Sequence, residues 1–349
     1  MINVGIIFGG KSSEHKVSIL SAINIFQALE SKENKKCFKV KCFYINKEGI
    51  WLSNEESMRL LTEHDNNKNL SFNNNNNQSF EVLSSQIKEI DIWFPITHGP
   101  NGEDGTIQGL LKLTGKPFIG SGVIGSALGM DKLIMKSLFH LGGLPQVKYI
   151  GTSTNEIKKR GLSHISKLID KKLKYPIFVK PANLGSSIGI TKVLDRNGLK
   201  HALEHASNYD EKIVIENSIK GLELECGVIG KNKLEASVVG QVNINTDWYD
   251  YESKYKNQLN EIVIPAEINK DVSKKIRALA IKACETLNVY GLARVDFFYE
   301  ETTSNIYINE INTLPGFTKK SMFPMLWANT GIKVDELISK LIKMALANE

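Results

Sequence analysis

The segment from Arg294 to Met322 limits the fold strongly, because it is typical of two strands that carry polar side chains on one face. Strand side chains alternate between faces, so Arg294 and Asp296 share a face, as do Glu310 and Asn312. Two carboxylates and an amide oxygen form a hard donor set that suits Mg²⁺ together with phosphate groups. Two interpretations stay open: a nucleotide-dependent metal site, or solvated acidic residues on a half-exposed sheet.

A Pro-Gly turn follows the second strand directly, in residues 313–318. Glycine lacks a side chain, so the backbone amides of such a turn can approach a ligand closely. The turn therefore favours the ligand-binding interpretation.

The chain has 349 residues, which is too long for one ordinary core and predicts two or three domains. With 42% hydrophobic and 23% charged residues, the composition is that of a soluble globular protein. No apolar run is long enough to span a bilayer, and Lys11, Glu14 and His15 follow the first strand-like run where a secretory leader would continue. We therefore expect a cytoplasmic protein that does not enter a membrane.

Three other features predict no function of their own. The four cysteines lack metal-binding or CxxC spacing and are expected to be free thiols in a reducing compartment. The net charge is only +6, and the basic stretch 158–174 lies between two apolar segments, where a solvated face or a linker is favoured over a nucleic-acid patch. The Asn-rich tract 66–78 cannot pack a core and is expected to form a surface loop.

Strand and helix patterns alternate along the chain and predict an α/β fold whose N-terminal part contains a parallel sheet. We expect three domains, at residues 1–122, 123–217 and 218–349. The strands expected are Asn3–Phe8, Phe38–Ile45, Ile90–Ile96, Ile177–Lys180, Ile188–Val193, Leu222–Ile229 and Ala236–Gln241. The helices expected are Glu14–Leu29, Lys132–Leu141, Asp271–Leu287 and Val334–Ala347.

The segment Gly5–Ser12 matches the P-loop pattern GxxxxGK[ST], but we reject a P-loop there. Its residues 6–8 are the strand itself, which leaves only a two-glycine turn. That turn leads into a helix, with Ser12 or Ser13 as the expected N-cap and Glu14 in the first turn. Glu14 either completes the cap region or binds a cationic group of a substrate.

A nucleotide is the ligand that the middle of the chain indicates. Lys180 ends an apolar strand and precedes a Gly-Ser-rich turn whose amides and hydroxyls can close over phosphate. A hairpin with a snorkelling lysine is the alternative. Lys132 lies at a helix start, where a cation is disfavoured unless an anion offsets it. Glu216 and Glu223 at strand ends can bind ribose or adenine, or remain surface charges.

Five segments, taken in their order, resemble the D-alanine–D-alanine ligase family of ATP-grasp carboxylate-amine ligases. They are Gly10–Ser18, His98–Gly105, Phe178–Gly189, Asp250–Tyr255 and Asn309–Gly316. The resemblance covers nearly the whole chain and implies a three-domain ATP-grasp architecture with an N-terminal parallel-sheet domain. It also implies ATP and two Mg²⁺ or Mn²⁺ as cofactors, two D-alanine substrates and a homodimer that serves peptidoglycan synthesis.

The resemblance implies roles for individual residues. Those implied to bind ATP are Lys132, Lys180, Ser186, Ser187, Glu216, Glu223 and Lys254. Those implied to bind D-alanine are Glu14, His98, Arg294, Gly316, Ser321 and Met322. The implied metal ligands are Asp296, Glu310 and Asn312. The implied catalytic group comprises Glu14, Ser186, Lys254, Tyr255, Arg294 and Gly316.

The reaction implied by the resemblance has two steps. The carboxylate of the first D-alanine attacks the γ-phosphate of ATP, and the amine of the second then attacks the acyl phosphate. Arg294 and the Gly316 amide stabilise the oxyanion, and a hydrogen-bonded set of Glu14, Ser186 and Tyr255 closes the site. Residues 247–257 alone are typical of an edge strand with an aromatic face, but the resemblance favours a lid that excludes water.

The chain departs from the family pattern in the Asn-rich tract, the basic stretch and Lys320, which is expected at the surface.

Three rival functions stay open. They are a ligase that joins D-alanine to D-lactate or D-serine, another ATP-grasp ligase, and a non-catalytic ATP-binding protein. The intact segment 250–255 favours D-alanine as the acceptor, and the presence of all the implied metal and oxyanion residues argues against loss of catalysis.

Overall fold

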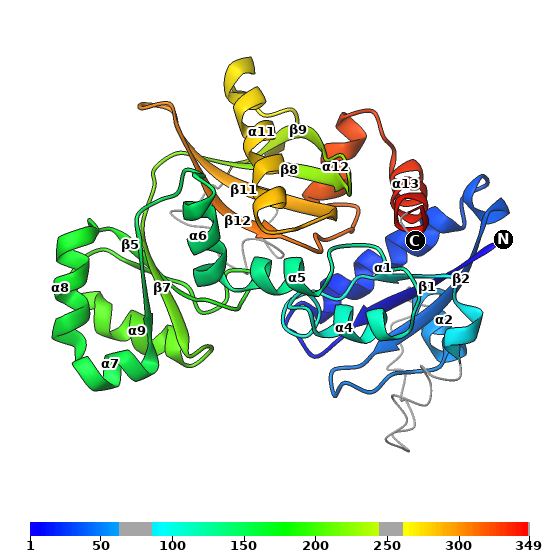
Figure 1. Ribbon diagram of the computed structural model, residues 1–349, viewed down its shortest axis with the longest axis horizontal. Coiled ribbons are helices and arrows are strands. Elements are labelled where there is room, and N and C mark those ends of the chain that lie inside the picture. The colour runs from blue at the N-terminus through cyan, green and yellow to red at the C-terminus, as the bar shows by residue number, and fades with distance from the viewer. Residues whose placement is uncertain (63–85, 244–260, 348–349) are drawn as a thin grey trace.

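The computed structural model describes residues 1–62, 86–243 and 261–347. It is an α/β structure with three separate sheets, which Figure 1 shows in three lobes. The Asn-rich tract 66–78 and the segment 247–257, with Lys254 and Tyr255, lie outside the described residues.

The N-terminal lobe contains the parallel sheet that the sequence predicts. Its strand order is β2-β1-β3, and β1 pairs in parallel with both neighbours. Apolar strand residues face helices on the sheet, as buried parallel strands require. The elements are β1 (Ile2–Gly9), α1 (His15–Leu29), β2 (Phe38–Ile45), α2 (Asn54–Thr62), β3 (Ile92–Pro95) and α4 (Thr106–Leu113).

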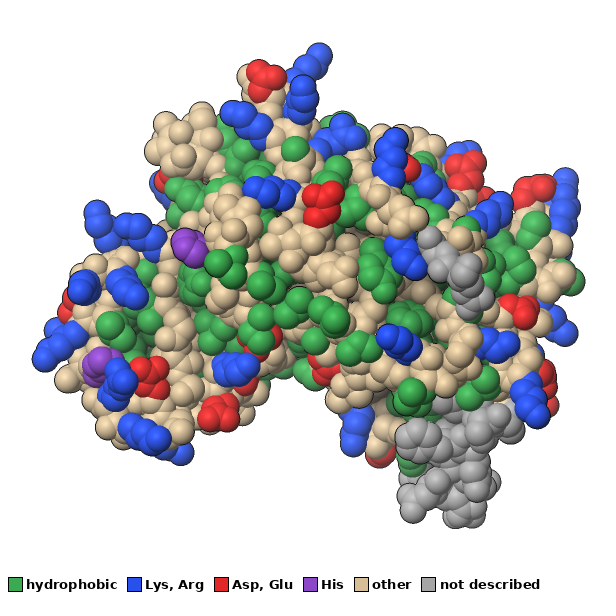
Figure 2. All heavy atoms as spheres, viewed as in Figure 1, with side chains coloured by type: hydrophobic (Ala, Val, Ile, Leu, Met, Phe, Trp, Pro, Cys, Tyr) green, Lys and Arg blue, Asp and Glu red, His purple; other side chains and the backbone are tan. Residues whose placement is uncertain are grey.

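The central lobe is an antiparallel sheet of order β4-β7-β5-β6 with its own hydrophobic core. Helices α7, α8 and α9 lie together on this lobe in Figure 1. The basic side chains of α7 and α8 are mixed with acidic ones on the face shown in Figure 2. The elements are β4 (Tyr149–Ser153), α7 (Thr154–Arg160), α8 (Leu162–Lys172), β5 (Ile177–Pro181), β6 (Thr191–Val193), α9 (Leu199–Ser207) and β7 (Lys212–Asn217).

The third lobe is an antiparallel sheet of order β10-β9-β8-β11-β12. One face packs against α11 and α6, and alternate positions of β8 and β9 face α12 on the other side. The elements are α5 (Val123–Met130), α6 (Lys132–Leu141), β8 (Leu222–Gly230), β9 (Glu235–Asn243), β10 (Glu261–Val263), α11 (Lys270–Thr286), β11 (Gly291–Glu300), β12 (Asn305–Asn312) and α12 (Met322–Asn329).

The last helix, α13 (Val334–Leu346), packs beside α1 of the N-terminal lobe. Leu337, Ile338 and Leu341 share one hydrophobic core with Val4 and Ile25. Phe317 and α12 also belong to this core. The chain after β12 is therefore held by apolar contacts to the N-terminal lobe, which fixes the interface where the candidate site lies.

The structure confirms the predicted elements, most of them to within one or two residues at their ends, and two differences have a physical reason. Helix α1 begins at His15 with Glu14 as the N-cap residue, so the prediction of Ser12 or Ser13 as N-cap was wrong. The strand expected from residue 188 begins at Thr191, because Gly189 has a φ value of 73° and continues the left-handed turn of Ser186 and Ser187, whose φ values are 52° and 59°. This left-handed backbone does not fit a strand.

Other predictions from the sequence can be compared directly. Residues 6–8 lie within β1, which confirms the rejection of a P-loop. The four cysteines are free thiols, as expected. Lys320 is exposed. Within residues 1–62, 86–243 and 261–347, no helix is long and apolar enough to cross a membrane.

Candidate active site

Strands β11 and β12 bring the predicted metal ligands together on one sheet face. Their antiparallel register pairs Arg294 with Asn312 and Asp296 with Glu310. The Asn312 amide nitrogen donates to Asp296 Oδ2 at 3.0 Å, while Ile311 points into the core on the other face. Because the facing carboxylates and the amide are hard oxygen donors, this set fits Mg²⁺ or Mn²⁺ in chemistry. The metal role itself stays a prediction.

Two carboxylates hold the Arg294 side chain in one direction. Its Nε lies 2.7 Å from Asp296 Oδ1 and 2.8 Å from Glu225 Oε2, and its Nη2 lies 2.7 Å from Asp296 Oδ2. Burial alone would lower the pKa of Arg294, but Asp296 and Glu225 raise it well above the usual value. The guanidinium is thus a fixed positive charge. Glu225 is not among the site residues that the resemblance implies, although its alternation with Glu223 in the sequence predicts that both carboxylates face one side of β8 and can bind ribose or adenine.

A buried cluster of Lys136, Lys180 and Glu216 joins the central lobe, which supplies Lys180 and Glu216, to α6 of the third lobe, which supplies Lys136. Glu216 Oε2 is 3.0 Å from Lys136 Nζ, and its Oε1 accepts from Lys180. Lys136 and Glu216 are each only 1% exposed. Burial alone would raise the pKa of Glu216, but the two lysines lower it to about 2. Sequence reasoning missed Lys136; its i+4 spacing from Lys132 on one helix was the available signal.

Lys132 connects the Gly-Ser turn with the metal-ligand face. Its Nζ donates to the carbonyl oxygen of Leu184 at 2.7 Å and lies 3.2 Å from Glu310 Oε2. Asp131 caps the same helix by accepting from two backbone amides at 3.0 and 3.1 Å. The nearby carboxylate offsets the unfavourable position of a lysine at a helix N-terminus.

The Gly-Ser turn reaches the N-terminal lobe through one side-chain contact. Ser186 donates a hydrogen bond to Glu14 Oε1 across 172 residues of sequence. Ser187 lies in the same turn, and Tyr255, the third predicted member of the set, is outside the described residues. The structure therefore brings together two of the three residues predicted to close the site.

The Pro-Gly turn places Gly316 beside the start of α12. A Cβ atom added at Gly316 would lie 2.9 Å from Ser321 Oγ, so glycine permits this close approach. Ser321 is the N-cap residue of α12, and Met322 begins the helix. Within the described residues, the Gly316 N–H donates to no protein atom. A helix N-terminus and an uncommitted amide together suit a carboxylate or an oxyanion.

His98 and Glu103, on the loop after β3, face the Pro-Gly turn. His98 Nδ1 lies 3.0 Å from the carbonyl oxygen of Leu314, and Glu103 accepts from the Leu314 amide at 3.3 Å. Burial lowers the pKa of His98. Burial and the neighbouring Glu14 raise the pKa of Glu103 to about 8. Glu103 had no predicted role, although its segment was among the five that carried the resemblance.

We expect Glu103→Gln to change how thermal stability depends on pH. Because folding raises the pKa of Glu103 from about 4.5 to about 8, the folded state holds a proton that the unfolded state releases between these values. Stability should therefore fall as pH rises from 5 to 8, and the glutamine variant should lose part of this slope. Tm measured across that range tests this, with the exposed Glu33→Gln as control. Equal slopes in wild type and Glu103→Gln would contradict it.

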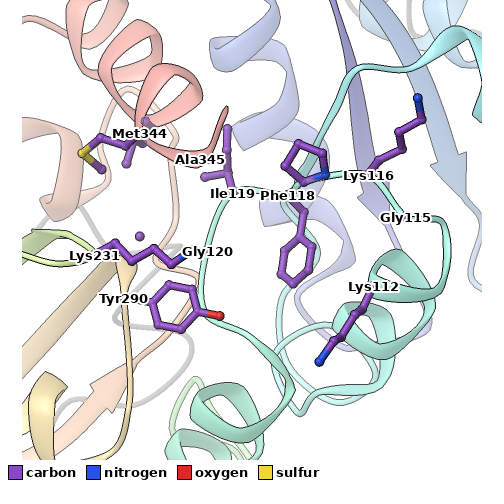
Figure 3. Close-up of a pocket in the computed structure, with 13 residues that line it drawn as sticks. Lys112, Gly115, Lys116, Phe118, Ile119, Gly120, Lys231, Tyr290, Met344 and Ala345 are labelled. Carbon is purple, nitrogen blue, oxygen red and sulfur yellow. The ribbon is translucent and has the colours of Figure 1, made fainter. Parts of the chain in front are cut away.

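A separate pocket of about 200 Å³ lies between the N-terminal lobe and the third lobe and contains none of the predicted site residues. Figure 3 shows Lys231 and Tyr290 on one side of it and Phe118 on the other. Met344 of α13 also lines it. The predicted ligand-binding residues are therefore grouped elsewhere, around the Gly-Ser turn, β11, β12 and the Pro-Gly turn.

Known proteins resemble both halves of the chain. Models of the D-ala D-ala ligase N-terminus and C-terminus match residues 3–121 and 138–343. A D-alanine–D-alanine ligase from Prochlorococcus marinus strain NATL1A is 51% identical over 343 residues, which cover 98% of this chain and 97% of that protein. The corresponding ligase of P. marinus subsp. pastoris is 49% identical over 345 residues, with coverages of 98% and 97%.

Solved structures with the same fold also match almost completely. The VanG D-Ala:D-Ser ligase from Enterococcus faecalis has a TM-score of 0.82 and 31% identity, covering 99% of both chains. The D-alanine–D-alanine ligase from Coxiella burnetii has a TM-score of 0.80 and 29% identity, covering 99% of this chain and 96% of its own. With family models on both halves and close relatives over its full length, the chain belongs to the D-alanine–D-alanine ligase family of ATP-grasp enzymes and is a ligase.

Proposed function

We propose that this ligase joins two molecules of D-alanine to D-alanyl-D-alanine, with ATP converted to ADP and phosphate. The observation that carries the proposal is the placement of opposite charges around the loop 98–103. A Cβ atom added at Gly99 would lie 3.2 Å from Glu14 Oε2, so this carboxylate lies against the loop. The charges of Glu14 and Arg294 both affect the pKa values of His98 and Glu103. A zwitterionic amino acid requires an anion for its ammonium group and cationic or N–H groups for its carboxylate. Relatives that are about 50% identical over the full chain support D-alanine as that amino acid.

The proposed roles follow the two-step chemistry. The carboxylate oxygen of the first D-alanine forms a bond to the γ-phosphorus while the bond to ADP breaks. The amine of the second then attacks the acyl carbon, loses a proton, and the phosphate leaves. Glu14 holds the first ammonium group, and Arg294 with the Gly316 amide bears the oxyanion charge. Ser321 and Met322, at the start of α12, hold the carboxylate of the second D-alanine.

ATP is proposed to lie between the central and third lobes. Lys132 and Lys180 contact its phosphates, and Ser186 and Ser187 close over them with Lys254. Glu216 and Glu223 are proposed on the nucleoside side. Two Mg²⁺ or Mn²⁺ ions held by Asp296, Glu310 and Asn312 would neutralise phosphate charge.

The contacts of Glu216 in the structure restrict its proposed role on the nucleoside side. Both of its oxygens already face lysines, so its direct effect is to fix Lys180 in place for a phosphate. Any additional contact to the nucleoside then has to come from an oxygen lone pair that these lysines leave open.

The second candidate function is ligation of D-alanine to a different acceptor, because the VanG enzyme with 31% identity is a D-Ala:D-Ser ligase. The higher identity to ligases named for D-alanine favours D-alanine here. The test measures phosphate release from ATP with D-alanine alone, then with D-serine or D-lactate added, and identifies the products by mass. We expect D-alanyl-D-alanine as the main product. Absence of D-alanine-dependent phosphate release would refute the proposal. A main product that joins D-alanine to D-serine or D-lactate would show that the acceptor is not D-alanine.

We further propose that the enzyme acts as a cytoplasmic homodimer in peptidoglycan precursor synthesis, and that it binds neither nucleic acid nor membrane. The resemblance to the family supports this assignment. Light scattering on the purified protein tests the dimer: a mass near 78 kDa is expected, twice the chain mass of 39.0 kDa. A mass near that of one chain would contradict it.

A further inference from the structure

Side chains of the N-terminal lobe hold the backbone on both sides of Pro315 and Gly316. They come from α1 and from the loop after β3, and each makes one hydrogen bond to Leu314 or Phe317. The bonds are Asn24 Nδ2 to Phe317 O (2.7 Å), Phe317 N to Ser21 Oγ (3.0 Å), His98 Nδ1 to Leu314 O (3.0 Å) and Leu314 N to Glu103 Oε1 (3.3 Å). We call Ser21, Asn24, His98 and Glu103 the turn clamp.

The turn clamp satisfies both backbone polar groups of both residues that flank Pro-Gly. Leu314 donates its N–H to Glu103 and accepts from His98 through its carbonyl oxygen. Phe317 does the same with Ser21 and Asn24. Two neighbouring peptide groups are thus fixed at each end, which leaves the intervening turn little freedom to rotate.

The two halves of the clamp also contact each other. His98 Nδ1 faces a carbonyl oxygen, which only accepts, so this nitrogen carries the hydrogen. The other ring nitrogen, Nε2, lies 3.5 Å from Ser21 Oγ. Because Ser21 Oγ accepts from the Phe317 amide, its own hydrogen is free to point at His98. The direction of every hydrogen bond in the clamp is therefore defined with neutral His98.

Three of the four clamp side chains are buried, Glu103 is half-buried, and further contacts hold the clamp in place. Ser21 is fully buried, and His98 and Asn24 are 4% and 8% exposed. Ser21 and Asn24 are three residues apart on α1 and so share one helix face. The second carboxylate oxygen of Glu103 accepts from the Gly99 amide at 2.9 Å. A clamp ordered in this way has one geometry to impose on the turn.

We propose that the turn clamp is a set of positioning residues that aims the Gly316 N–H at the reacting carbonyl. This inference rests on the proposed function, in which that amide stabilises the oxyanion. The Gly316 N–H is uncommitted within the described residues, so its direction follows from the fixed peptide groups on either side. Oxyanion stabilisation depends steeply on such alignment, since displacement by about 1 Å can cost 100-fold in rate.

The chain offers a matched pair of asparagines for the test. Asn24 and Asn34 are both buried, at 8% and 7% exposed, and both donate from Nδ2 to a backbone carbonyl of the C-terminal part of the chain; Asn34 also donates to the carbonyl oxygen of Ala28 at 2.9 Å. Asn24 reaches Phe317, whereas Asn34 reaches Asp335 at 3.0 Å, away from the turn. Asn24→Ala and Asn34→Ala therefore both remove a bond between the N-terminal and C-terminal parts of the chain, and Asn34→Ala, which loses the Ala28 bond as well, is the more severe structural control.

The experiment compares kcat, KM for ATP and Tm, together with binding of a phosphinic acid dipeptide that mimics the tetrahedral intermediate. For Asn24→Ala we expect kcat to fall about 10- to 100-fold with KM for ATP within twofold, and affinity for the phosphinate to fall by a similar factor. Asn34→Ala should keep kcat within twofold even where its Tm falls as much. Ser21→Ala, which changes volume little, provides a second clamp variant if Asn24→Ala does not fold.

The possible outcomes separate this inference from the proposed function. A wild-type enzyme without D-alanine-dependent phosphate release would refute the proposed function itself. In an active enzyme, wild-type kcat in both clamp variants would overturn the clamp. Equal loss of kcat in Asn24→Ala and Asn34→Ala would also overturn it, because the effect would then be structural. Weaker ATP binding with unchanged phosphinate affinity would overturn it as well.

Discussion

Replacement of Arg294 by alanine is expected to abolish ligation while ATP still binds. The guanidinium is fixed by Asp296 and Glu225, and its charge is the one proposed for the oxyanion. Loss of one oxyanion-stabilising contact typically costs about 3 to 4 kcal/mol, or roughly 100- to 1,000-fold in kcat. Phosphate release with D-alanine measures the catalytic loss, and calorimetry with ATP measures binding.

Two further variants test whether the loss of ligation in Arg294→Ala comes from the position and shape of this guanidinium. Arg294→Lys keeps a positive charge but cannot contact both carboxylates with a planar group, so we expect it to recover little activity. Arg277→Ala removes an arginine of α11 that donates to the carbonyl oxygen of Ala236 at 2.7 Å, outside the candidate site. It should keep near-normal turnover. Near-normal turnover of Arg294→Ala would show that the oxyanion role is wrong.

Replacement of Glu216 by glutamine is expected to give the largest loss of stability. Glutamine keeps the shape of Glu216 but leaves Lys136 and Lys180 buried without their shared anion. Removing one partner of a buried ion pair typically costs about 3 to 5 kcal/mol in the free energy of unfolding. Urea unfolding measures the change in free energy. Because a chain with several lobes need not unfold in one step, hydrogen exchange of the β5 and β7 amides measures the stability of this sheet separately.

The control for Glu216 is an exposed pair in the same lobe. Lys200 and Glu204 are 3.9 Å apart and largely exposed, so Glu204→Gln should change the free energy of unfolding by less than about 1 kcal/mol. The pH dependence gives a second check. Because folding lowers the pKa of Glu216 to about 2, its contribution is present above pH 4.5 and is lost as the pH falls toward 2. Equal stability of wild type and Glu216→Gln would contradict the cluster's role.

Local sequence patterns predicted the elements that carry the site. The alternation of Asp296, Glu310 and Asn312 with apolar residues defined one polar sheet face, and the structure confirms the strands and their pairing. The same rule identified the strand that ends at Lys180 and the helix that begins at Lys132. These predictions succeed because side-chain direction within a strand or helix depends on neighbouring residues alone.

Contacts between distant segments could not be predicted in the same way. Glu225 with Arg294, and Lys136 with Glu216, depend on which strands and helices become neighbours after folding. The side chain of Glu14, the N-cap residue of α1, makes no capping hydrogen bond and instead accepts from Ser186, 172 residues away. A tertiary hydrogen bond thus directs a side chain that local capping rules would place elsewhere.

The sequence by itself determined the α/β class, most strands and helices, and a residue set that resembles one ligase family. Only the tertiary structure decided how the N-terminal lobe holds the Pro-Gly turn. Asn24 and Phe317 are 293 residues apart, and no local pattern links them. The physical reason is that buried backbone groups in an irregular turn must find partners, and those partners come from whichever lobe the hydrophobic core packs against them.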